Sequence, residues 1–252
     1  MKQQPRLHVT GATGYLGAAL VRLRPDASTE RVDVRDAGAV RVLLERVRPR
    51  VVVHTAYRQD GPGAWEVTVA GAEHVARAAA AVGARLVHLS TDVVFDGRKG
   101  RPYVEDDPPC PVTDYGRAKV EAERRVAAAH PAALLVRTSL IVGGPDVPPS
   151  KHELAARDPT LTFFTNEIRS PVQVADLATA LLELAALDVA GPLHVAGLDA
   201  VSRADLAELV TGRPARRAEA PPTRPLDCTL DSSAAQARIR TRLRGVREIF
   251  QR

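Results

Sequence analysis

Tyr115 and Lys119 lie four positions apart, and this pair is the clearest chemical signal in the sequence. Residues at i and i+4 lie on the same face of a helix, so the phenol and the ammonium would share one site. A tyrosine with an ordinary pKa of about 10 is a poor acid at neutral pH, and a neighbouring cation lowers that pKa by stabilising the phenolate. The pair therefore indicates general acid catalysis by Tyr115 with help from Lys119.

A polar segment, Ser90-Thr91-Asp92, ends an apolar run that is typical of a buried strand. The Thr91 hydroxyl could donate to a substrate carbonyl oxygen and share with Tyr115 the stabilisation of the negative charge that develops as hydride arrives. Ser90 is a rival donor at the same strand end. Asp92 has a structural alternative, because an aspartate at this position can cap the turn that follows.

The segment Thr10-Gly11-Ala12-Thr13-Gly14-Tyr15-Leu16-Gly17 follows another apolar run and opens an amphipathic stretch. Its glycines permit a tight turn, close approach of the backbone to a pyrophosphate, and close packing of a helix on a strand. The N-terminus of that helix would offer N–H donors and positive potential to the phosphates. A strand before and a helix after the glycines predict a dinucleotide-binding turn.

The residue that would select between NAD and NADP is hard to find. An acidic residue about 20 positions after the glycine turn usually holds the adenosine ribose of NAD. Arg22 and Arg24 are candidate partners of a 2′-phosphate, or plain surface charges. Asp33 and Val34, at the end of an expected short strand, are candidate adenine-side contacts. The predicted coenzyme is therefore NADP or NAD, with the preference open.

Short apolar runs alternate with amphipathic stretches of helical length, which is the rhythm of βαβ units. Strands are predicted at Leu7–Thr10, Val51–His54, Arg85–Ser90 and Ala133–Arg137. Helices are predicted at Gly11–Arg22, Ala37–Val47, Ala64–Val82, Tyr115–Ala129 and Val174–Leu187. The predicted fold class is α/β, a Rossmann-type doubly wound parallel sheet, in which ligands bind at the carboxyl ends of the strands.

Prolines mark a change of organisation after residue 142, with a cluster at 145–149 and a second proline-rich stretch at Pro214–Pro225. We expect a dinucleotide-binding Rossmann domain over residues 1–142. A smaller C-terminal substrate-binding lobe would cover residues 143–252, with part of that chain returning to the Rossmann sheet. Near the C-terminus, apolar residues at helical spacing predict a packed helix with a solvated basic face over Arg238–Arg252.

The composition is that of a globular protein. Hydrophobic residues make up 45% and charged residues 26% of the 252 positions, which excludes disordered, fibrous and membrane-spanning proteins. The net charge is +5, but the arginines are scattered and no recognition motif is present, so no nucleic-acid partner is predicted. Cys110 and Cys228 lie outside any C-x-x-C spacing, so neither a disulfide framework nor a metal site is expected. Without a signal-peptide pattern, a cytoplasmic location and no membrane partner are expected.

Along the chain, the glycine turn is followed by the polar strand end at Ser90–Asp92 and then by the Tyr115–Lys119 pair. Together, in this order, these three features resemble the extended short-chain dehydrogenase/reductase superfamily. Within it, the chain is similar to the dTDP-4-dehydrorhamnose reductase family, as a divergent member. The segments that carry the likeness are Ser90–Gly97, Pro102–Asp107, Arg137–Ser139, Arg169–Val172, Asp176–Ala178, Gly191–Gly197, Arg224–Pro225 and Leu230–Asp231. The region between Leu23 and Glu30 is shorter than the second strand region of that family.

The resemblance implies a reduction. Hydride passes from the nicotinamide to a keto carbon, Tyr115 gives the proton, Lys119 binds the nicotinamide ribose and lowers the tyrosine pKa, and Thr91 holds the carbonyl. The implied substrate is a nucleotide-activated 4-keto-6-deoxy sugar.

The implied cofactor-binding residues are Gly11, Thr13, Gly14, Tyr15, Leu16, Gly17, Asp33, Val34, Thr55, Ala56, Ser90, Tyr115 and Lys119. The implied substrate-binding residues are Thr91, Asp92, Val93, Tyr115, Leu140, Arg169 and Arg224. Arg137, Arg169 and Arg224 are candidates for the diphosphate of the substrate, and each could equally form an internal ion pair.

Other functions stay open at this point. One is a non-catalytic cofactor-binding regulatory subunit, similar to the non-catalytic subunit of methionine adenosyltransferase. The Tyr115–Lys119 pair argues against it, because a protein that only binds has no need of a tuned phenol. Another is an epimerase, or a reductase of a different small carbonyl compound, since one Tyr–Lys pair serves all of these reactions. The sequence also leaves the oligomeric state open, with a homodimer as one option.

Overall fold

The computed structural model describes residues 7–251. Its main sheet has five strands, and several of the predicted site residues lie at or just after the ends of these strands. The strand order is β1-β2-β3-β4-β9. Their bounds are β1 Leu7–Thr10, β2 Val51–His54, β3 Arg85–Thr91, β4 Leu134–Thr138 and β9 Gly191–His194. The sheet is parallel, with Thr10 in register with His54 and His54 in register with His88. The predicted α/β fold with a parallel Rossmann-type sheet is confirmed.

The chain divides into two compact units, each made of several segments. Unit 1 takes the described chain up to Ser90, then Arg117–Val136 and Leu181–Pro192. Unit 2 takes the remaining segments: Thr91–Gly116, Arg137–Ala180 and the described chain from Leu193 onward. The domain boundary expected at residue 142 stays a prediction, because these units interleave along the sequence.

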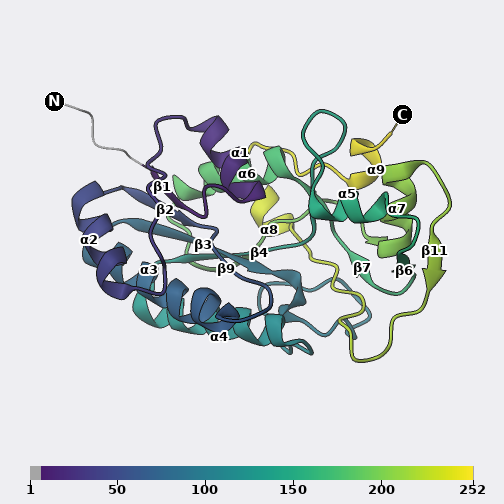
Figure 1. Cartoon of the computed structure of the whole chain (residues 1–252), viewed down its shortest axis with the longest axis horizontal. Helices are drawn as coiled ribbons and strands as arrows, with labels where there is room; N and C mark the ends of the chain where they lie inside the picture. The colour runs from purple at the N-terminus through teal and green to yellow at the C-terminus, as the bar shows by residue number, and fades with distance from the viewer. Residues whose placement is uncertain (1–6, 252) are drawn as a thin grey trace. The chain divides into compact units, whose positions relative to one another are not determined.

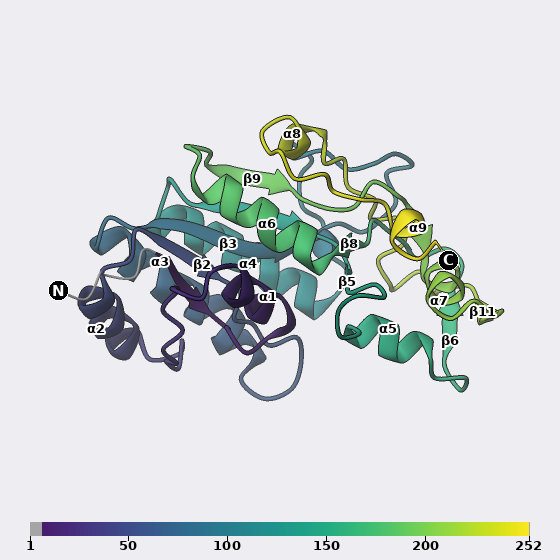
Figure 2. The same cartoon turned by 90° about the horizontal axis from the view of Figure 1, so that it is seen from above.

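In unit 1, helices cover both faces of the strands. Their bounds are α1 Tyr15–Leu23, α2 Ala37–Val47, a π-helical turn at Glu66–Ala70, α3 Gly71–Ala81 and α4 Asp114–Ala129, whose first residues belong to unit 2. Figure 1 shows α1 above the strands and α2, α3 and α4 below them, and Figure 2 looks onto the face with α1. Apolar residues of α2, α3 and α4 pack on Val52, Leu86 and Leu135 of the sheet. This core fixes α4 against β3.

Unit 2 is built from shorter elements. Three two-stranded sheets pair β5 Ile141–Val142 with β8 Val172–Gln173, β6 Thr162–Phe164 with β11 Arg216–Ala218, and β7 Ile168–Arg169 with β10 Val201–Ser202. The helices are a 3-10 turn at Asp92–Val94, α5 Lys151–Ala156, α6 Val174–Ala185, α7 Arg203–Thr211, α8 Ser233–Gln236 and α9 Val246–Ile249. The C-terminal part of α6 belongs to unit 1.

Two predicted elements are wrong. No strand ends at Asp33 and Val34. Of the segment between α1 and α2, Ser28 alone pairs with β1, through backbone hydrogen bonds with Leu7 and Val9, and the chain then leaves the sheet. The helix expected over Arg238–Arg252 is reduced to the four residues of α9. Of the apolar residues predicted to pack there, Ile239, Leu243 and Val246 are buried and Phe250 is partly buried. Ile239 and Leu243 lie in an irregular segment, where the Gln236 side chain donates to Thr241 O and accepts from Leu243 N.

Candidate active site

The glycine turn after β1 is shaped for close approach. Gly11 has a φ of 72°, a backbone conformation that side chains disfavour. A Cβ on Gly17 would lie 2.2 Å from Gly11 O, so the start of α1 can pack on the turn only if residue 17 has no side chain. Gly14 is the N-cap of α1, and no side chain caps this helix in the described structure. The N-terminus of α1 therefore presents the positive end of the helix dipole to an anion.

The remaining residues of the predicted turn lie on the same helix start. Tyr15 begins α1, and Leu16 and Gly17 are buried in its first turn. Thr13 is exposed between the two glycines. After β2, the Thr55 hydroxyl donates to Thr10 O at 2.7 Å, which ties the carboxyl ends of β1 and β2 together. The residue that follows, Ala56, faces the glycine turn, since a Cβ on Gly11 would meet its backbone at 2.8 Å.

A pocket of about 490 Å³ adjoins this turn within unit 1. Its lining comprises Val9–Thr13, Thr29–Arg35, Ala56, Arg58 and Val67. Asp33 lies in it, but its carboxylate is engaged by Arg35, whose Nη2 donates to Oδ2 at 2.6 Å. This pairing holds the pKa of Asp33 at about 2. Val34 is buried in the core and contributes to the pocket wall. Neither Arg22 nor Arg24 lines the pocket, and Arg24 pairs with Asp26.

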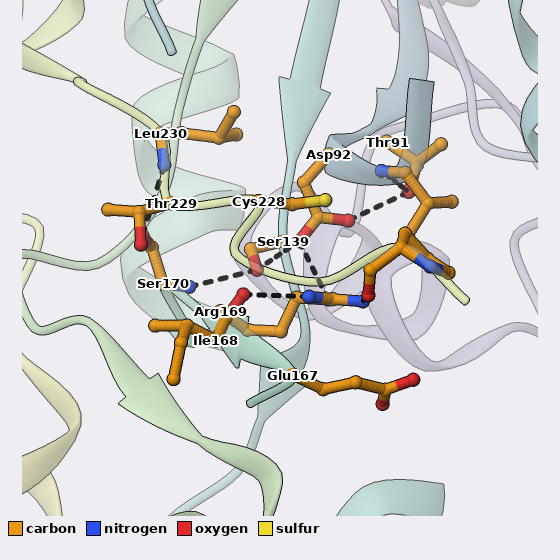
Figure 3. A network of polar contacts seen from close by, with 12 residues as sticks. Thr91, Asp92, Ser139, Glu167, Ile168, Arg169, Ser170, Cys228, Thr229 and Leu230 are labelled. Atoms are coloured by element: carbon orange, nitrogen blue, oxygen red, sulfur yellow. Dashed lines mark hydrogen bonds and ion pairs between the residues drawn. The ribbon is translucent and has the colours of Figure 1, made fainter. Parts of the chain in front are cut away.

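The end of β3 carries a network of polar contacts in unit 2 (Figure 3). Thr91 is the N-cap of the 3-10 turn, and its hydroxyl accepts from Val93 N at 3.4 Å and donates to Asp92 Oδ1 at 3.2 Å. Asp92 is buried, and its Oδ2 accepts from the Ser139 hydroxyl at 2.6 Å. Burial raises the pKa of Asp92, while Arg169 opposes that shift. Asp92 therefore anchors a buried network, and Thr91 supplies the turn cap.

The first turn of α4 lies against the segment that follows β3, within unit 2. A Cβ on Gly116 would lie 2.4 Å from Val93 O, so this close approach requires glycine beside Tyr115. The backbone contact brings the residue pair Tyr115-Gly116 to the Thr91–Val93 turn. One turn further along α4 lies Lys119, as the spacing predicts.

Lys119 is buried in unit 1 and is only 3% exposed. Its Nζ donates to Leu89 O at 2.8 Å and lies 5.1 Å from the centre of the Tyr57 ring. Burial lowers the pKa of Lys119 to about 8, and the negative charge of Glu123 opposes this effect. Ser90, the predicted rival donor, gives its hydrogen bond to Glu123 Oε1.

The three candidate diphosphate arginines have internal partners. Arg137 donates to Glu105 O at 3.3 Å, and its guanidinium lies 5.3 Å from the Phe95 ring centre. Arg169 forms an ion pair with Asp92. Arg224 donates to Glu167, although half of its side chain remains exposed. Leu140, a candidate substrate contact, packs on the apolar cluster around Val142 and Val246.

Sequence reasoning missed several residues of this region. Glu123 lies four positions after Lys119 between buried positions of α4, and a carboxylate on an apolar helix face could have signalled a role. His54 and His88 lie side by side beneath the strand ends, with ring centroids 5.3 Å apart. Arg31, Arg35 and Arg58 line the pocket, but they come from irregular segments whose course the sequence does not show.

Residues 7–251 contain no group of three or more His, Cys, Asp or Glu side chains placed to hold a metal ion. Cys110 is exposed and Cys228 is buried, and both are free thiols. No helix in the same part of the chain is long and apolar enough to cross a membrane.

The glycine turn and its pocket fit a dinucleotide. Gly11 and Gly17 let the turn, the start of α1 and the end of β2 pack together without side chains between them, and the pocket beside the turn continues to Asp33. A turn of this kind lets the backbone approach a pyrophosphate closely. Residues 5–251 match the RmlD substrate binding domain family. The chain belongs to this family. The predicted resemblance to the dTDP-4-dehydrorhamnose reductases is thereby confirmed.

Relatives of this RmlD family member agree over most of its length. The dTDP-4-dehydrorhamnose reductase of Mycobacterium tuberculosis (strain H37Rv) is 37% identical over 220 residues, which cover 79% of this chain and 72% of the relative. That of Mycolicibacterium smegmatis is 34% identical, covering 98% and 84%. Among solved structures, a hypothetical dTDP-4-dehydrorhamnose reductase from Sulfolobus tokodaii has a TM-score of 0.83 at 28% identity, covering 95% and 96%. The Bacillus anthracis reductase in complex with NADP shares the fold, with a TM-score of 0.85 at 24% identity, covering 98% of each chain.

Proposed function

We propose that this chain is an NAD(P)H-dependent reductase of a nucleotide-linked 4-keto-6-deoxy sugar, of the dTDP-4-dehydrorhamnose reductase type. The observation that carries the proposal is the position of Tyr115 and Lys119 one turn apart on α4, whose start Gly116 fits against Val93. The names of the relatives supply the substrate class, and a solved structure of the same fold binds NADP.

The side chains divide the reduction between them. Bound NAD(P)H supplies the hydride that converts the keto carbon into an alcohol. Tyr115 gives its phenolic proton to the oxygen that becomes negative, and the Lys119 ammonium stabilises the phenolate that remains. Thr91 keeps its proton and donates a hydrogen bond to the same carbonyl oxygen. Because that hydroxyl donates to Asp92 in the described structure, Thr91 must exchange this acceptor for the substrate.

The glycine turn is the proposed site of the coenzyme phosphates. The positive potential at the N-terminus of α1 would bind the pyrophosphate, and the pocket around Asp33 would take the adenosine side. We also propose that Thr55, Ala56 and Lys119 contact the coenzyme. The regulatory-subunit alternative draws no support from relatives that are reductases. A cytoplasmic location and a homodimer remain proposals from the sequence.

The direct test follows the loss of NADPH or NADH absorbance when dTDP-4-dehydrorhamnose is added to the full chain. We expect turnover by the wild type and a loss of roughly 100-fold to 10,000-fold in kcat for Tyr115→Phe, because the proton donor is removed. Tyr103→Phe is the matched control, since the Tyr103 phenol donates to Asp96 and has no proposed part in the reaction. Full activity of Tyr115→Phe beside an active wild type would contradict the mechanism.

A further inference from the structure

Glu123 is a buried carboxylate that the proposed reaction does not use. It lies on α4, four positions after Lys119, and is only 5% exposed. Ala122 and Val126, on the same helix, belong to the hydrophobic core of unit 1. An ionised carboxylate at this depth is costly unless it is hydrogen-bonded or paired with a cation.

Two consecutive residues of β3 hold Lys119 and Glu123 in place. Leu89 O accepts the hydrogen bond of Lys119 Nζ at 2.8 Å, and the Ser90 hydroxyl donates to Glu123 Oε1. Ser90 is itself buried, so water does not compete freely for this bond. The cation and the carboxylate, one turn apart on α4, are therefore fixed against the same strand end.

The other groups around Lys119 do not supply a negative charge. From β2 and the residues after it come His54 and the Tyr57 ring, and from β3 comes His88. Burial lowers the pKa of both histidines, to about 3 for His54 and well below its ordinary value for His88, so both imidazoles are neutral at neutral pH. On α4 itself, Tyr115 lies one turn before Lys119. Glu123 is thus the negative group in this set.

We propose that Glu123, held by Ser90, is the positioning residue that keeps the Lys119 ammonium charged and in place. This inference rests on the proposed function, in which Lys119 acts on the Tyr115 phenol. A neutral lysine cannot stabilise a phenolate, so the reductase needs a counter-charge to offset the cost of burying its cation.

The test is the pH dependence of kcat for the wild type and Glu123→Gln. The rate of reduction should fall as pH rises through the Lys119 pKa. Without the Glu123 charge, this fall in rate at alkaline pH should begin about one pH unit lower. The value of kcat at high pH would then be about tenfold below that of the wild type, with little change near pH 6. Glu123→Asp, which keeps the charge, should restore the wild-type pH dependence. Glu121→Gln is the matched control, because Glu121 lies on α4 but pairs with Arg124 and Arg125 near the surface.

The outcomes separate the two proposals. A wild type that depends on Tyr115, with an unchanged pH dependence in Glu123→Gln, would overturn the role of Glu123 and leave the reductase intact. If no keto sugar nucleotide is reduced, the proposed function fails. The titration of Lys119 is then followed by NMR of ¹³C-labelled lysine, which is practical because the chain has four lysines. A lower Lys119 pKa in Glu123→Gln supports the inference and an unchanged one overturns it. Should Glu123→Gln not fold, Ser90→Ala replaces it, and we expect the pH at which kcat falls to move in the same direction by a smaller amount.

Discussion

Asp92 and Arg169 form a buried ion pair, in which Oδ2 lies 3.7 Å from Nε and neither side chain is more than 4% exposed. Arg169 also donates to Ile168 O at 2.7 Å (Figure 3) and to Pro225 O at 2.9 Å. The pair therefore joins the turn after β3 to β7 and to the segment at Pro225, all within unit 2. Of the two roles open to Arg169 from the sequence, the geometry favours the internal ion pair.

The first prediction concerns this pair. Arg169→Met should lower the free energy of unfolding by about 3–5 kcal/mol, because it leaves the Asp92 carboxylate buried without its cation. Urea titration of the purified chain measures the change. Arg217→Met is the control, since Arg217 is 43% exposed in its ion pairs with Asp205 and Glu208, and a much smaller loss of stability is expected. Unchanged stability with a raised KM for the sugar nucleotide would instead make Arg169 a substrate ligand.

Local sequence patterns predicted the sheet and the glycine turn well. The bounds of β1 and β2 agree with the predicted strands, because each is a short apolar run that the core requires. The partner of Arg169 could not be predicted, since Asp92 and Arg169 meet only through the folding of unit 2. The same holds for Ser90 and Glu123, which lie 33 residues apart. At the C-terminus, the helical spacing of apolar residues predicted a helix that does not form there, because an irregular segment buries Leu243.

The second prediction concerns the packing of α1 on the glycine turn. Gly17→Ala should weaken coenzyme binding by at least tenfold, because a Cβ 2.2 Å from Gly11 O forces the helix start away from the turn. Isothermal titration with NADPH and NADH measures the dissociation constants. Gly38→Ala, in the first turn of α2, is the matched control and should leave coenzyme binding unchanged, because Gly38 does not line the pocket. Equal affinity in Gly17→Ala and the wild type would place the coenzyme elsewhere.

The third prediction concerns the choice between the two coenzymes. Asp33 neutralises Arg35 through a bidentate pair in the pocket that also contains Arg31 and Arg58. Asp33→Asn should release that positive charge and favour the coenzyme with a 2′-phosphate, raising the NADPH-to-NADH affinity ratio by roughly fivefold.

Asp26→Asn is the control for this change, since it frees Arg24 in the same way at a position that does not line the pocket. Dissociation constants for both coenzymes, measured at two salt concentrations, should show the effect of Asp33→Asn weakening as screening increases. A parallel change in both affinities would show that the adenosine ribose lies away from Asp33.

The last prediction follows from the buried histidines of unit 1. Burial lowers the pKa of His8 to about 4 and that of His54 to about 3, below the ordinary value of 6.5. The unfolded chain therefore binds protons that the folded chain does not as pH falls from 6.5. Each such histidine contributes a slope of about 1.4 kcal/mol per pH unit, so stability should be full above pH 6.5 and decline toward the folded pKa values.

His54→Asn should reduce the slope of unfolding free energy between pH 6.5 and 5, measured by urea titration. Val53→Ala, on the same strand, should lower stability at every pH and leave the slope unchanged. A wild-type stability independent of pH in this window would show that these imidazoles have the same pKa in the folded and unfolded chains, which would contradict the shift caused by burial.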